Sequence, residues 1–166
     1  MITAIQTLSQ VRSASASTVK VNLLSNCSDP YLKKILRLAY DPYIIFNIGK
    51  AHLSGRWQNI NPNAFNSIEP TAATRNISDI VMDELAMMSA RKSVNSDDVR
   101  RMNMFFSWLH NEFSEEIPDV VEWVKAIIAK DLRCGISIKT VHKVFHNLIN
   151  EFIVQLAEPC ERINPE

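Results

Sequence analysis

The chain has 166 residues, few of them glycine or cysteine, and no long apolar run. Its three cysteines, Cys27, Cys134 and Cys160, are odd in number and widely spaced, which favours a reducing compartment over a disulfide framework. No apolar segment reaches the roughly 20 residues that span a bilayer. The start, Met1–Gln6, lacks the basic region of a secretory signal. We therefore expect a cytoplasmic protein with no membrane partner.

Residue arrangements typical of catalysis are also lacking. The sequence has no Asp-Gly dipeptide, and its three glycines are too far apart to form a glycine-rich phosphate loop. His142 and His146 lie near Cys134 in sequence, but no fourth ligand has metal-ligand spacing. For Cys134, a half-buried structural side chain is a simpler interpretation than a nucleophile. We predict no catalytic residue, no metal site and no cofactor in this chain.

The net charge is zero, but the charges are unevenly distributed. Residues 1–60 carry a net charge of +5 and residues 123–149 carry +4, whereas residues 61–122 carry −6 and the last seventeen carry −3. If the two positive blocks meet in space, they form a basic face that the zero net charge of the whole chain does not reveal. Such a face would suit an anionic partner.

Apolar residues recur at helical spacing through most of the chain. The pattern predicts helices over residues 2–12, 17–26, 29–40, 77–92, 97–112, 117–132 and 137–146. Residues 49–68 contain glycine, proline and asparagine without periodicity, and we expect a loop there. Only Ile44–Phe46 offers a short apolar run that could form a strand. We predict an all-α fold: one compact domain of about six to eight helices over residues 1–150, with residues 151–166 as a connector or tail.

The segment around Gly135 carries the strongest functional signal. Gly135 can adopt a positive φ and so end the preceding helix. The next helix is expected to bury Ile138, Val141, Val144 and Phe145, and its first turn would offer backbone N–H groups to an anion. The donors collected there are of the types that contact phosphate groups. The candidate contact residues are Lys130, Arg133, Gly135, Ser137, Lys139, Thr140 and Lys143.

Residues 130–157 read KDLRCGISIKTVHKVFHNLINEFIVQLA. This segment resembles the end of the N-terminal DNA-binding domain of ATP-dependent DNA ligases, in particular the T-even-type phage enzymes. The matching positions are Asp131-Leu132, Gly135, Lys139-Thr140-Val141, Lys143-Val144, Leu148-Ile149 and Gln155-Leu156-Ala157. The segment Tyr31–Tyr40 also resembles a helix of that domain. Asn150 departs from the family, which prefers proline there.

The resemblance implies an all-α module that binds duplex DNA across the minor groove on both sides of a nick. It would position the nick for ligation in replication, repair or recombination. ATP and Mg²⁺ would belong to a separate nucleotidyltransferase domain, on the same or a second polypeptide, because the family's Lys-x-Asp-Gly adenylation motif is missing here. We expect a monomer, in the bacterial host's cytoplasm if a phage encodes it. Weaker candidates for DNA contacts are Lys20, Lys33, Lys34, Lys50 and Arg56.

Three other hypotheses remain open at this point. Residues 137–146 could be the recognition helix of a helix-turn-helix regulator, although that helix is poor in the Arg, Asn and Gln side chains that distinguish base edges well. The chain could be a helical protein-interaction module without a nucleic-acid role. It could also be an intact enzyme by itself.

Overall fold

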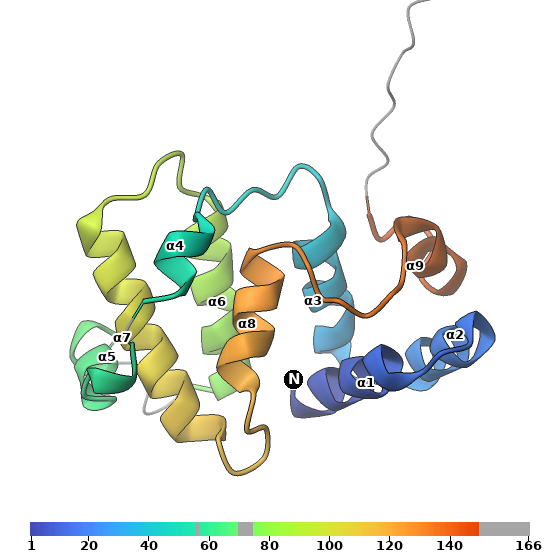
Figure 1. Ribbon diagram of the computed structural model, residues 1–166, viewed down its shortest axis with the longest axis horizontal. Coiled ribbons are helices and arrows are strands. Elements are labelled where there is room, and N and C mark those ends of the chain that lie inside the picture. The colour runs from blue at the N-terminus through green and yellow to red at the C-terminus, as the bar shows by residue number, and fades with distance from the viewer. Residues whose placement is uncertain (56, 70–74, 150–166) are drawn as a thin grey trace, which may run out of the picture.

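The computed structural model describes residues 1–55, 57–69 and 75–149, and every regular element in these ranges is a helix (Figure 1). The α-helices are α1 (Ile2–Ser13), α2 (Ser17–Asn26), α3 (Pro30–Tyr40), α4 (Lys50–Leu53), α5 (Asn63–Ile68), α6 (Ile77–Ser89), α7 (Ser96–Phe113), α8 (Val120–Ile128) and α9 (Ile138–Val144). A single 3-10 turn, η1 (Trp57–Asn59), precedes α5. The predicted all-α fold is confirmed.

One local prediction was wrong. Residues 49–68, predicted to be a loop, contain α4, η1 and α5. These helices are too short to show the apolar periodicity on which the prediction relied. Ile44–Phe46 is irregular, and the described ranges contain no strand. The predicted connector at 151–166 lies outside the described residues.

Helix α8 lies at the centre of the domain. Figure 1 shows α4, α5, α6 and α7 on one side of it and α1, α2, α3 and α9 on the other. It packs against both α3 and α7. The residues that α8 buries are Val120, Val121, Trp123, Val124, Ile127 and Ile128, which lie on one face of the helix, whereas Glu122 on the opposite face is exposed. An amphipathic helix of this kind packs its apolar face against the core and leaves its polar face toward the solvent.

The side of the domain formed by α4–α7 is held by an aromatic cluster. The ring centroid of Phe65 lies 5.5 Å from that of Phe105 and 5.0 Å from that of Trp108. Tilted pairs at such distances contribute about 0.5–1.5 kcal/mol beyond the burial of their area. Helix α7 itself begins with a capping box in which Asn95 and Asp98 each accept a hydrogen bond from the other's backbone N–H.

On the other side, Asp29 joins the starts of α1 and α3. Its carboxylate accepts hydrogen bonds from the N–H groups of Tyr31 and Ala4, at 2.9 and 3.0 Å. The amino group of Met1 lies 2.9 Å from the same carboxylate, and the Met1 side chain is 1% exposed. Burial acts to raise the pKa of Asp29, but the ammonium and the two N–H groups outweigh it, so the pKa lies below its usual value.

We predict that Asp29→Asn lowers the free energy of unfolding by about 1–3 kcal/mol at pH 7, because a buried ammonium loses its charged partner. A carboxyl group whose pKa is lowered by folding stabilises the fold above its unfolded pKa, near 3.8, and this contribution disappears as the pH falls through the folded pKa. The difference between wild type and variant should therefore shrink below about pH 4. Urea unfolding across this pH range measures it. Asp97→Asn, at an exposed position of α7, is the control and should show a smaller, separate effect.

Candidate nucleic-acid interface

The segment between α8 and α9, residues 129–137, is here called the corner. Helix α8 ends at Ile128, four residues earlier than predicted. The N–H of Asp131 donates to the carbonyl of Ala126 at 2.9 Å, and the N–H of Lys130 donates to that of Ile127 at 3.0 Å. This pattern is a Schellman helix end, in which the left-handed residue is normally glycine. Here Lys130 takes that place, with φ of 56°. The prediction that Gly135 ends the helix was wrong.

Lys130 does not extend outward from the corner. Its ammonium donates hydrogen bonds to the backbone carbonyls of Asp41 and Ile44, the second at 2.7 Å. Burial lowers the pKa of Lys130, although the nearby Asp41 acts in the opposite direction. The side chain therefore joins the corner to the loop after α3. Lys130 is not placed for the phosphate contact predicted for it.

Two more cations reach the corner from the N-terminal helices. Arg12 of α1 donates from Nη2 to the carbonyl of Leu132 at 2.8 Å, and its guanidinium lies 3.7 Å from the ring centroid of Trp123. Lys20 of α2 is only 9% exposed, and its Nζ donates to the carbonyls of Cys134 and Gly135 at 2.7 and 3.3 Å. Arg12, Lys20 and Lys130 are called the inward cations below, because each donates to the backbone, although Arg12 itself is exposed.

Side chains in the middle of the corner alternate between the interior and the solvent. Leu132 and Cys134 are each 1% exposed, whereas Arg133 and Gly135 lie at the surface. Burial raises the pKa of the Cys134 thiol. A buried thiol with a raised pKa is a poor nucleophile, which supports the structural interpretation of Cys134.

Two features favour glycine at position 135. Its φ is 59°, a conformation that costs other residues about 1–2 kcal/mol. A Cβ added there would lie 2.6 Å from Lys20 Nζ. Arg133 also has a positive φ, 51°, and its N–H faces the Asp131 carboxylate at 3.3 Å.

Helix α9 is shorter and less buried than predicted. It covers Ile138–Val144, and of its residues only Val141 is buried, whereas Ile138 is 37% exposed. Ser137 caps it: its hydroxyl accepts a hydrogen bond from the Thr140 N–H at 3.3 Å and lies 3.2 Å from the Thr140 hydroxyl.

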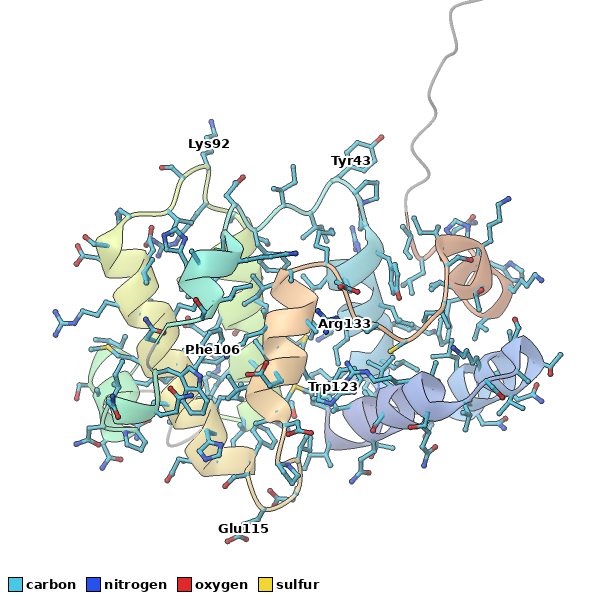
Figure 2. All side chains as sticks on the ribbon, viewed as in Figure 1. Tyr43, Lys92, Phe106, Glu115, Trp123 and Arg133 are labelled. Atoms are coloured by element: carbon cyan, nitrogen blue, oxygen red, sulfur yellow. The ribbon has the colours of Figure 1, made fainter. Side chains whose placement is uncertain are left out.

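The candidate residues with exposed cationic side chains are Arg133, Lys139 and Lys143, here called the outward cations. Arg133 lies on the face turned to the viewer in Figure 2, beside α8. Its side chain is 81% exposed and forms an ion pair with Asp131, itself 60% exposed, at 3.3 Å. An exposed pair of this kind contributes little to stability. Arg133 can therefore exchange Asp131 for another anion.

The two positive blocks of the sequence do meet. Arg12 and Lys20 come from the first block and bind the corner, which belongs to the second. Of the weaker candidates, Lys20 is buried, whereas Lys33, Lys34 and Lys50 are exposed. Lys33 lies over the Phe145 ring and Lys34 over the Tyr31 ring. Arg56 lies outside the described residues. Sequence analysis missed Arg12, whose partner is 120 residues away.

Within the described residues, no three His, Cys, Asp or Glu side chains are grouped to hold a metal ion. In the same ranges, no helix has the length and apolar character needed to cross a bilayer. No protein-family model and no curated protein matches this chain.

We predict that Gly135→Ala lowers the free energy of unfolding by about 2 kcal/mol. The new methyl group would strain the backbone and displace Lys20 Nζ from the carbonyl of Cys134. Gly49→Ala is the matched control, because φ there is −72° and the added Cβ would meet its nearest atom at an ordinary 3.8 Å. The control should change stability by less than about 1 kcal/mol. Equal losses in the two variants, measured by thermal unfolding, would contradict the role given to Gly135.

Proposed function

We propose that this domain binds duplex DNA through the phosphate backbone and acts as the non-catalytic DNA-binding domain of an ATP-dependent DNA ligase. One observation carries the proposal. The outward cations lie on and just after a corner whose backbone is fixed by the inward cations. A ligand that meets side chains on a fixed backbone loses less of its binding energy to ordering the protein.

The side chains available favour phosphate over base contacts. Lysine acts as a compact point charge, and arginine can bind a phosphate through two parallel N–H groups. Ser137 and Thr140 add hydroxyl groups at the start of α9. Donors of these kinds position a duplex without distinguishing its sequence. Helix α9 has seven residues and follows a long corner, unlike the recognition helix after a turn of three or four residues in a helix-turn-helix.

The resemblance to ligases is supported by what the shared residues do. Asp131 follows the left-handed helix end, Leu132 is buried, and Gly135 has the positive φ next to Lys20. The burial of Leu132 and the positive φ of Gly135 each restrict which amino acids fit at those two positions. In this proposal the domain holds nicked DNA across the minor groove, and a separate nucleotidyltransferase domain performs the ATP- and Mg²⁺-dependent chemistry.

We expect Lys139→Ala combined with Lys143→Ala to weaken binding about tenfold or more, equally for unrelated duplex sequences. Each phosphate neutralised contributes about 0.9 to the slope of log K against log salt concentration, so the slope should fall by about 1.8. Fluorescence anisotropy with a labelled nicked duplex over a range of salt concentrations measures both quantities.

The control for these variants is Lys92→Ala, an exposed lysine on the turn between α6 and α7, at the edge of the domain in Figure 2. It should bind DNA as the wild type does. Unchanged binding in the double variant would exclude α9 from the interface. A strong preference of the wild type for one sequence would argue against phosphate recognition.

We also expect no covalent adenylate when the protein is incubated with radiolabelled ATP and Mg²⁺, because the sequence has no Lys-x-Asp-Gly motif to carry AMP on a lysine. Gel electrophoresis under denaturing conditions detects such a product. A labelled band at the mass of this chain would overturn the non-catalytic assignment.

A further inference from the structure

Beside the corner lies an open groove of about 490 Å³, formed by α1, α4, α8 and residues of the corner. Its charged lining residues are Arg12, Lys50, Lys125, Arg133, Glu122 and Asp131. Four positive and two negative side chains therefore face one concave surface, in a chain whose net charge is zero. Figure 1 shows α4 and α8 on the viewer's side, where the chain after α8 crosses in front of α3 toward α9.

The four cations differ in how strongly they are engaged. Arg12 is fixed by the Leu132 carbonyl and the Trp123 ring. A carbonyl is a neutral partner, so the positive charge of Arg12 is not cancelled. Lys50 is exposed at the start of α4. The groove thus combines one positive charge that is held by a carbonyl and a ring with one on an exposed lysine, both from the first positive block.

The other two cations are paired with carboxylates. Lys125 Nζ lies 2.8 Å from Glu122, and Arg133 lies 3.3 Å from Asp131. The carboxylates are 67% and 60% exposed. The Arg133 pair is exposed on both sides and therefore weak, so a phosphate can replace Asp131 at modest cost. In the other pair Lys125 is 16% exposed, and only Glu122 lies open to the solvent. The exchange can be measured, because a variant that lacks the competing carboxylate should bind phosphate groups more tightly than the wild type.

We infer that the groove seats a second stretch of phosphodiester backbone, continuous through Arg133 with the contact made by α9, and that Asp131 and Glu122 act there as competing anions. This inference rests on the proposed DNA binding. It extends the interface from α9 across the corner to Lys50 on α4.

Two substitutions with opposite signs test the inference. Lys50→Ala should weaken binding to nicked duplex about threefold to fivefold and lower the salt slope by about 0.9, the value for one phosphate. Asp131→Asn should strengthen binding about twofold to fivefold, because it frees Arg133 and removes a like charge. The asparagine oxygen can still accept the hydrogen bond that Asp131 Oδ1 accepts from the Arg133 N–H, so the corner keeps its shape. Unfolding curves check that both variants fold.

The matched controls are Lys92→Ala and Asp97→Asn, which make the same changes of charge on α7 and the turn before it. Both should bind DNA as the wild type does, apart from a small effect of net charge that each control shares with its matched groove variant. A gain of affinity in Asp131→Asn beyond that of Asp97→Asn supports the inference. Equal effects at the groove and control positions overturn it, because only net charge would then matter.

The α9 double variant separates the two proposals. If it binds DNA weakly while Lys50→Ala and Asp131→Asn match the wild type, DNA binding stands and the groove inference is wrong. If the wild type does not bind DNA, both proposals fail. A titration with inorganic phosphate distinguishes a strand from a free ion: phosphate binding that requires Lys50, together with DNA binding that ignores it, would make the groove a small-anion site and overturn the inference.

Discussion

The candidate interface depends on three cations that bind the backbone, of which Lys20 is buried, Lys130 is half-buried and Arg12 is exposed. Arg12, Lys20 and Lys130 donate hydrogen bonds to backbone carbonyls of the corner and of the loop after α3. An irregular segment cannot satisfy its own carbonyls as a helix does, and a buried carbonyl without a donor costs about 1–3 kcal/mol. Donors that carry a charge form stronger hydrogen bonds than neutral ones. The inward cations therefore allow a non-helical segment to pack tightly against helices.

This anchoring determines which side chains are left for a ligand. With the carbonyls of Leu132, Cys134 and Gly135 held by Arg12 and Lys20, the side chains between them alternate between core and solvent. Two left-handed residues besides Gly135, namely Lys130 and Arg133, turn the chain sharply. The direction in which α9 starts follows from these turns. The same contacts that stabilise the corner thus fix where its exposed charges stand.

The sequence predicts the fold better than it predicts the site. Long helices such as α7 and α8 were found because apolar residues repeat along several turns. The end of α8 was misplaced, because glycine is the usual left-handed residue and Lys130 takes that role with help from carbonyls more than 80 residues away. From sequence alone, Lys130 and Lys139 are both candidates for contacts with phosphate groups. Only the folded chain shows that one is engaged inside and the other is exposed.

The charge of its partner decides whether a cation that is bound within the protein still contributes to the surface potential. In the acidic block, Arg101 is paired with Glu84 and Glu69, and Arg75 with Asp83, so these charges largely cancel. The inward cations instead bind carbonyls, which are dipoles without net charge. Their field is only partly screened, because the Debye length in 0.1 M salt is about 10 Å and the corner is not fully solvated. A chain of zero net charge can in this way keep a positive face. Its cations stabilise the backbone through their hydrogen bonds and still contribute positive potential at the surface.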